Sequence, residues 1–142
     1  GITVNLYGPT RKNVQEKTKS LVNVAAHVIT GPLNLVAGSY DVLNKADVIK
    51  INSITHSVDG DVTDRYTLEG GQKDNYYALS SIRLNANSRP VSDANGTLTV
   101  DYDYYAHSAG DYFAVDSYVV PYDEIPTHVT GGSIHTLADA ID

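Results

Sequence analysis

Apolar and polar side chains alternate along most of this chain with a period of two residues. The clearest segment covers residues 97–104, where Leu98, Val100 and Tyr102 alternate with threonines and aspartates. Successive side chains of a β-strand point to opposite faces, whereas a helix would spread these residues around its circumference. The segment therefore predicts a strand with one dry face and one solvated face.

Weaker forms of the same alternation occur in other segments that we expect to be strands: 2–6, 21–28, 48–55, 62–68, 81–84 and 112–120, with a short piece at 33–35. Asp59-Gly60 and Asn95-Gly96 have the composition of two-residue hairpin turns, which need a positive φ at both positions. Helical signals are confined to short stretches at 13–19 and 136–141.

About seven strands with frequent turns favour an all-β fold, namely an antiparallel immunoglobulin-like β-sandwich. A small β-barrel is the alternative. We expect residues 1–20 to form an N-terminal linker or edge segment and residues 21–122 to form the sandwich domain. Residues 123–142 are expected to be a C-terminal linker towards a following domain. The chain has no Met at its start, so we expect it to have been processed or excised from a longer protein.

The distribution of charge argues against nucleic acid as a partner. The formal net charge is −7, and residues 90–142 contain nine acidic side chains and no Lys or Arg. Such a half repels a phosphate backbone, and the few basic residues at 11–19 do not offset it. No apolar run approaches the roughly 20 residues of a membrane span. The absence of cysteine excludes disulfides and thiolate chemistry.

Tyrosine is unusually frequent, with eleven residues against one Phe and no Trp. Tyr suits pleated, half-buried strands, and it also suits interfaces because it has an apolar ring and a polar tip. Alternation places Tyr104 with the buried residues and Tyr105 on the opposite face. Core packing is the simpler explanation for most of the tyrosines. Our candidate interface or binding residues are Tyr105, Tyr112 and Tyr118.

Three acidic residues crowd one turn and are weak candidates for a metal site: Asp59, Asp61 and Asp64. Calcium prefers several oxygen ligands, but no glutamate closes a twelve-residue EF-hand loop here. Hairpin-turn chemistry already accounts for Asp59 and the glycine after it. We therefore expect no metal and no cofactor.

A catalytic reading of His107, Ser108 and Asp111 lacks the context that catalysis needs. A triad requires a base that a third group orients and a preformed oxyanion site. The G-x-S-x-G turn that exposes a nucleophilic serine is absent, and the five histidines have no zinc-like spacing. We expect no catalytic residues and no enzymatic activity.

Three stretches resemble one family when taken together and in order. Residues 61–66 read Asp-Val-Thr-Asp-Arg-Tyr and are followed by Leu-Glu-Gly-Gly-Gln-Lys-Asp-Asn-Tyr-Tyr at 68–77. The second stretch covers 98–118, and the third combines 122–126 with 137–142. They are similar to a domain of large structural proteins of tailed phages, notably T4-like phages of cyanobacteria. Glu69-Gly70 and Lys73 depart from the family pattern, which has Asp-Asn and Arg there.

The resemblance implies a structural role in a virion tail, baseplate or fibre, with no catalysis attached to these motifs. Other virion proteins, or copies of the same chain, are the partners that it implies. It also implies that Asp142 is a cut point rather than a natural terminus. The alternative is a carbohydrate-binding or host-adhesion module that takes a host-surface glycan. A hydrolase is the third and least favoured hypothesis.

The polar residues of the first stretch are expected to specify the fold, because short polar side chains at strand ends can bond backbone groups that lack ladder partners. Arg65 with Asp64 or Asp74 is expected to form a partly buried pair that fixes a loop. The residues of this expected structural motif are Asp64, Arg65, Gln72, Asp74 and Asn75.

Overall fold

The computed structural model of the chain describes residues 1–5, 7–9, 11–74, 76–121, 124–125 and 127–136. The chain divides into two compact units, one of Lys19–His107 and the other of Gly1–Thr18 with Ser108–Asp142. The division differs from the expected one, because described residues 108–121 group with the N-terminal stretch and not with the sandwich.

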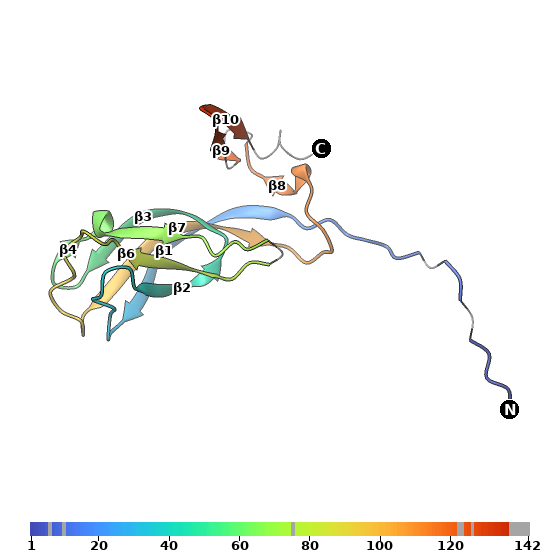
Figure 1. Ribbon diagram of the computed structural model, residues 1–142, viewed down its shortest axis with the longest axis horizontal. Helices are drawn as coiled ribbons and strands as arrows, with labels where there is room; N and C mark the ends of the chain where they lie inside the picture. The colour runs from blue at the N-terminus through green and yellow to red at the C-terminus, as the bar shows by residue number, and fades with distance from the viewer. Residues whose placement is uncertain (6, 10, 75, 122–123, 126, 137–142) are drawn as a thin grey trace. The chain divides into compact units, whose positions relative to one another are not determined.

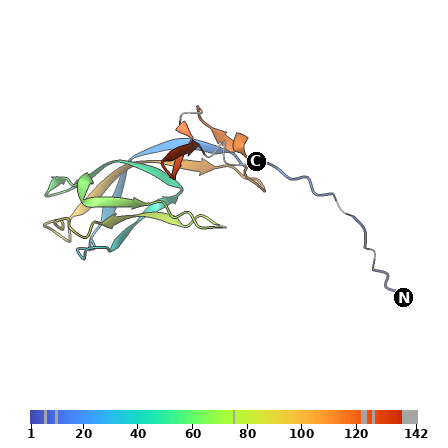
Figure 2. The same ribbon diagram turned by 45° about the horizontal axis from the view of Figure 1, so that its top comes forward.

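The Lys19–His107 unit is a sandwich of two antiparallel sheets (Figure 1, Figure 2). Its larger sheet has the order β4-β3-β7-β1, built from β1 (Lys19–Thr30), β3 (Val48–His56), β4 (Gly60–Asp61) and β7 (Thr97–His107). Its smaller sheet has the order β2-β6-β5, built from β2 (Tyr40–Ala46), β5 (Tyr66–Glu69) and β6 (Leu79–Leu84). The predicted all-β, immunoglobulin-like sandwich is confirmed, and the sheets do not close into the alternative barrel.

Strand β7 lies in the middle of the larger sheet, between β1 and β3, and its inward side chains form the centre of the core. Leu98, Val100 and Tyr102 are fully buried, as the alternation predicts. The smaller sheet covers them with Leu43 from β2 and with inward residues of β5 and β6. Burial of each such side chain stabilises the fold by roughly 1.5–3 kcal/mol, so this contact holds the two sheets together.

Two predicted strands and one predicted helical stretch are not formed, and a third predicted strand is formed only in part. Described residues 1–5 carry no strand, and residues 33–35 form none although Leu33 is buried. Within 112–120, Tyr112 makes only an isolated bridge to Glu16, followed by a 3₁₀ turn, η2 (Val115–Ser117), and the short β8 (Tyr118–Val119). The stretch at 13–19 is extended and leads into β1. Alternation alone does not make a strand where no neighbouring strand offers a ladder.

The second unit also contains a hairpin of β9 (Thr127–Thr130) and β10 (Ser133–Thr136). Gly131 and Gly132 connect the two strands with φ of 60° and 84°, which is the backbone that a type I′ turn requires. Backbone hydrogen bonds of 2.7 Å, from Lys17 N to Tyr112 O and from Asp111 N to Gln15 O, join the N-terminal stretch to residues after β7. The expected helix at 136–141 lies, from residue 137, outside the described residues.

Tyr66 on β5 places a hydroxyl group inside the core without a hydrogen-bond partner among the described residues. Burial, followed by the nearby Asp41 carboxylate, raises the pKa of Tyr66 to about 12. The folded state therefore keeps the phenol proton more tightly than the unfolded chain, in which a tyrosine ionises near pH 10. Stability should fall as the pH rises from about 10 to about 12.

We predict that Tyr66→Phe raises the free energy of unfolding by about 1 kcal/mol, because it removes a buried polar group that makes no bond. The variant should also lose less stability than the wild type between pH 10 and 12. Urea titrations at neutral and alkaline pH measure both effects. Tyr40→Phe is the control, since the Tyr40 side chain is half exposed. A Tyr66→Phe protein less stable than wild type would contradict the prediction.

Candidate functional site

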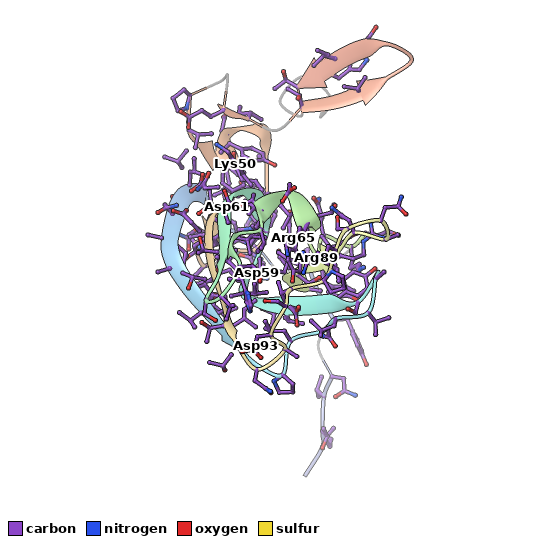
Figure 3. The ribbon with its side chains drawn as sticks, turned by 90° about the vertical axis from the view of Figure 1, so that its left-hand side faces the viewer. Lys50, Asp59, Asp61, Arg65, Arg89 and Asp93 are labelled. Atoms are coloured by element: carbon purple, nitrogen blue, oxygen red, sulfur yellow. The ribbon has the colours of Figure 1, made fainter. Side chains whose placement is uncertain are left out.

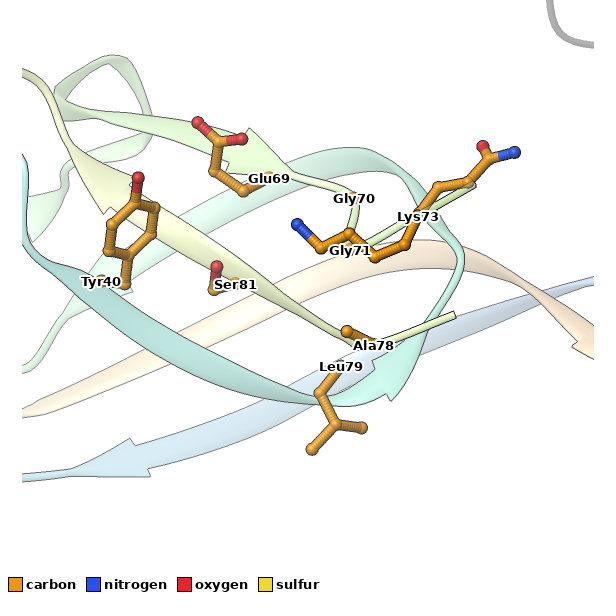
Figure 4. A pocket seen from close by; sticks show the side chains of 9 residues that line it. Tyr40, Glu69, Gly70, Gly71, Lys73, Ala78, Leu79 and Ser81 are labelled. Atoms are coloured by element: carbon orange, nitrogen blue, oxygen red, sulfur yellow. The ribbon is translucent and has the colours of Figure 1, made fainter. Parts of the chain in front are cut away.

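A pocket of about 370 Å³ opens on the outer face of the smaller sheet. Its floor is Ser81 of β6, and the β5–β6 loop borders it with the backbone of Gly70 and Gly71. In Figure 4 the Tyr40 ring stands at one end, the Lys73 amine reaches in from the other, and Ser81 lies between them. The pocket thus combines a flat aromatic ring with hydroxyl, ammonium and carboxylate groups.

The β5–β6 loop needs glycine to form this border. Gly71 has a φ of 73°, and a Cβ atom on it would lie 2.5 Å from the carbonyl oxygen of Ala78. The same close approach lets Ala78 N donate to Gly71 O at 2.9 Å, while Lys73 N donates to Tyr76 O at 2.9 Å. The loop therefore extends the hairpin beyond β5 and β6 and projects Lys73 over the pocket.

Three apolar side chains on the strands that border the pocket are half exposed. Tyr40 and Val42 of β2 and Leu79 of β6 are between 50% and 57% exposed. Beside them, Arg83 Nε lies 3.2 Å from Glu69 Oε1. Half-exposed apolar side chains with polar groups at their edge are the composition of many surfaces that partners cover. We call Tyr40, Val42, Glu69, Leu79, Ser81 and Arg83, with the loop beside them, the outer face.

A second polar cluster lies at the β3–β4 end of the sandwich (Figure 3). Arg65 Nη1 lies 2.9 Å from Asp59 Oδ2, and the same carboxylate accepts hydrogen bonds from the backbone N and the hydroxyl of Ser92. Asp59 N donates to His56 Nδ1 at 3.2 Å, which places the buried imidazole under the turn. Arg65 thus forms an ion pair with Asp59, a partner that the sequence analysis did not consider.

The three weak metal candidates use their oxygens in different contacts. The Ser92 hydroxyl, followed by the Arg65 guanidinium, lowers the pKa of Asp59 to about 2. Asp61 accepts from Thr63 Oγ1 at 2.6 Å and Thr63 N at 3.0 Å, and these bonds lower its pKa. Asp64 is exposed, and its backbone carbonyl accepts from Asn85 at 3.2 Å. Among the described residues, no three acidic, His or Cys side chains form a cluster suited to a metal.

The remaining motif residues lie in the β5–β6 loop. Gln72 is exposed, pairs with Tyr77 through an isolated bridge and lines the pocket. Asp74 is exposed. Asn75 lies outside the described residues. The residues of the expected structural motif therefore lie in two places. Asp64 and Arg65 are at the β3–β4 end, and Gln72 is beside the pocket.

A third cluster is centred on two buried charged side chains, and we call it the lysine network: Lys19, Asp47, Tyr77, Tyr105 and His107. Its His107 side chain is 24% exposed. Lys19 Nζ lies 3.0 Å from Asp47 Oδ2, with 5% and 10% of the two side chains exposed. His107 Nε2 lies 2.6 Å from the same oxygen. Lys19 Nζ also donates to the Tyr77 hydroxyl at 2.7 Å. One buried carboxylate oxygen thus contacts two basic groups.

Sequence reasoning missed most of the lysine network. Lys19 lies at the end of a basic stretch that resembles a linker, and Asp47 resembles an ordinary turn residue. Only the pairing of strands brings them together, because Lys19 lies opposite His107 in the β1–β7 ladder and Tyr105 N donates to Asp47 O at 3.0 Å. Lys19 and His107 lie just outside the alternating segments 21–28 and 97–104, although they begin β1 and end β7. The period of the sequence therefore gave no signal for this cluster.

The expectation that Tyr105 is an exposed binding residue is wrong, because only 2% of it is exposed. Its side chain does leave the core face, but Lys19 Nζ lies over the ring, 5.8 Å from its centroid. Tyr112 is 44% exposed, and Tyr118 is partly buried in β8. These two residues belong to the second unit, whereas Tyr105 belongs to the sandwich.

Each residue of the rejected triad has a partner of its own. His107 bonds Asp47, as described above, and the Ser108 hydroxyl accepts from Thr18 N at 2.8 Å. Asp111 lies 2.7 Å from Lys12 Nζ, and this ammonium group lowers its pKa. These contacts connect backbone segments, and they do not orient a nucleophile.

The solvated face of β7 carries a fourth cluster, in which two asparagines bridge two aspartates. Asn23 Nδ2 of β1 donates to Asp101 and Asp103 at 2.8 Å each, and Asn52 Nδ2 of β3 donates to the same pair at 2.9 and 3.2 Å. The bonds from Asn52, followed by those from Asn23, lower the pKa of Asp101. This cluster ties three neighbouring strands together.

Comparisons with known proteins give no family for this chain. No protein-family model, curated protein or solved structure matches it significantly. In the described part of the chain, no helix has the length and apolar content needed to cross a bilayer.

We predict that Asp59→Asn weakens the sandwich most above pH 4. A carboxylate whose folded pKa is about 2, against about 3.9 unfolded, stabilises the fold above pH 4 and loses that effect as the pH falls towards 2. The difference in thermal midpoint between wild type and variant should therefore shrink between pH 4 and pH 2. Asp74→Asn, in the exposed loop, is the control. A difference that stays constant across this range would contradict the assignment.

Proposed function

We propose that the chain is a non-enzymatic structural or assembly module of a phage virion protein, in the tail, baseplate or fibre. The observation that carries the proposal is the use of Asp59 and Arg65, which together with Ser92 fix one end of the sandwich. Arg65 belongs to the first stretch that resembles the phage domains. A motif residue whose charge is used in a loop contact stabilises the conformation of that loop. An assembly module needs such fixed loops, because its neighbours bind to a surface of defined shape.

The outer face is the surface that we assign to assembly, with another virion protein or a copy of this chain as its partner. Three half-exposed apolar side chains lie there on the adjacent strands β2 and β6: Tyr40, Val42 and Leu79. Covering them would bury apolar area at about 25 cal/mol per Å². The flanking Glu69 and Arg83 supply the polar rim that such interfaces have.

Mass spectrometry of purified particles of the virus that encodes the chain tests the role. Peptides of this chain are expected in intact particles, in a fixed ratio to the other structural proteins. Presence of the chain in infected cells together with its absence from purified particles would overturn the proposal.

A substitution on the outer face tests the surface. Val42→Asp should lower the amount of the chain in purified particles by more than about tenfold, because an interface carboxylate without a partner costs more than 1.4 kcal/mol. Val28→Asp is the matched control, since Val28 is similarly exposed on the larger sheet. Equal incorporation of both variants, with unchanged thermal midpoints, would assign assembly to another surface.

The second candidate function is glycan binding by the pocket, as expected of a host-adhesion module. The observation that favours it is the half-exposed Tyr40 ring at one end of a pocket that also holds Ser81, Glu69 and Lys73. A sugar presents an apolar face that packs on an aromatic ring and hydroxyl groups that bond to polar side chains.

A glycan array tests this second function. Binding that Tyr40→Ala abolishes, while Tyr112→Ala in the second unit retains it, would support adhesion through the pocket. The absence of binding to every glycan, or equal loss of binding in both variants, would contradict it.

A further inference from the structure

The lysine network places an amine beside a carboxylate in a site from which water is largely excluded. Lys19 Nζ and Asp47 Oδ2 are 3.0 Å apart, and at most a tenth of either side chain is exposed. Removing two such charges from water costs several kcal/mol per ion before their attraction is counted. A buried ion pair is therefore a costly arrangement, and a neutral product of the two groups would relieve that cost.

Asp47 is also held in an unusual backbone conformation. Its φ of 54° makes it the one non-glycine residue with a positive φ in the described part of the chain. Asp tolerates this conformation better than most residues do, and strain of this kind often occurs at functional sites. The conformation directs Asp47, between β2 and β3, to the first residue of β1.

We propose that Lys19 and Asp47 condense to an intramolecular isopeptide bond, which makes the pair a modification site that joins β1 covalently to the β2–β3 turn. This proposal goes beyond the assembly role and does not depend on it. It requires no external reagent, because an ammonium and a carboxylate contain the atoms and the net charge of one amide and one water.

The condensation moves two protons from nitrogen to the oxygen that leaves. One ammonium proton moves to Asp47 Oδ2 across the 3.0 Å contact, which leaves an amine and a carboxylic acid. The nitrogen lone pair of Lys19 then forms a bond to Cγ of Asp47. A second proton passes from nitrogen to Oδ2, the bond from Cγ to Oδ2 breaks, and that oxygen leaves as water. The third proton stays on the amide nitrogen.

His107 is positioned to carry the second proton. Its Nε2 lies 2.6 Å from Oδ2, the oxygen that has to leave, and general acid–base catalysis needs contact at this distance. Tyr77 also holds the amine, since Lys19 Nζ donates to its hydroxyl at 2.7 Å and lies 4.8 Å from its ring centroid. The rings of Tyr77 and His107 pack edge to face, with their centroids 4.7 Å apart, and cover one side of the ion pair.

Intact-protein mass spectrometry of the purified chain tests the proposal directly. We expect a mass lower than the sequence mass by one water molecule. Trypsin should then fail to cleave after Lys19 and should release a branched peptide in which residues 18–45 are joined to residues 46–50. Fragmentation of that peptide locates the bond. A wild-type chain at the full sequence mass, with no branched peptide, would overturn the proposal.

Substitutions at Lys19 and Lys50 distinguish the cross-link from other reactions of the chain that also release one water molecule. The Asp59-Gly60 sequence can cyclise to a succinimide of the same mass, so the variants are needed. Lys19→Arg keeps a cation at the site but should restore the full sequence mass, whereas Lys50→Arg, at an exposed position of β3, should leave the loss of water unchanged. Loss of water that persists in Lys19→Arg would refute the cross-link.

Two further variants test the chemistry of the reaction. Asp47→Asn should form the same amide with release of ammonia in place of water, which changes the mass loss by a resolvable amount. His107→Gln should slow bond formation by about 10²-fold or more if the histidine acts as the acid. Bond formation in His107→Gln at the wild-type rate would remove His107 from the mechanism.

Discussion

The pairing of β7 with two neighbouring strands is the constraint on which the rest of the structure depends. Its register with β1 and β3 turns Leu98, Val100 and Tyr102 into the core, where the smaller sheet covers them. A shift of one residue would exchange the two faces of the strand and bury Asp101 and Asp103. The cost of burying two carboxylates fixes the register as firmly as the gain from burying the apolar side chains.

The polar clusters hold different parts of the sandwich around β7 in place. Asn23 and Asn52 hold the solvated face of β7 to its neighbours, and the ion pair of Asp59 and Arg65 fixes the loops at one end. The lysine network includes His107, the last residue of β7. Polar side chains are therefore used chiefly to hold backbone segments in place, which is the behaviour that a structural module requires and the reason for the assembly role proposed above.

The sequence predicted the strands whose side chains alternate regularly between apolar and polar. It did not predict the contacts that depend on which strands pair. Alternation identified β3 and β7, and it is most regular at residues 98–102 of β7, where buried core residues alternate with partly exposed ones. In β3 two register shifts against β7 interrupt the alternation of buried and exposed side chains. Alternation failed at Ile2 and Val4, for which the described part of the chain offers no partner strand. It also assigned Tyr105 to a binding surface, since period alone does not tell whether a side chain from the next strand covers the outward face. The ion pair of Asp59 with Arg65 and the approach of Lys19 to Asp47 follow from tertiary register, which no motif encodes.

Native-state hydrogen exchange of the β7 backbone amides tests the central claim most directly. If β7 is the frame of the sandwich, the amides of Leu98, Val100 and Tyr102 should exchange only through global unfolding, with the free energy that urea titration gives. Those amides should also be the slowest in the chain. Exchange of β7 amides as fast as that of residues 1–5, under conditions in which the chain is folded, would contradict the account.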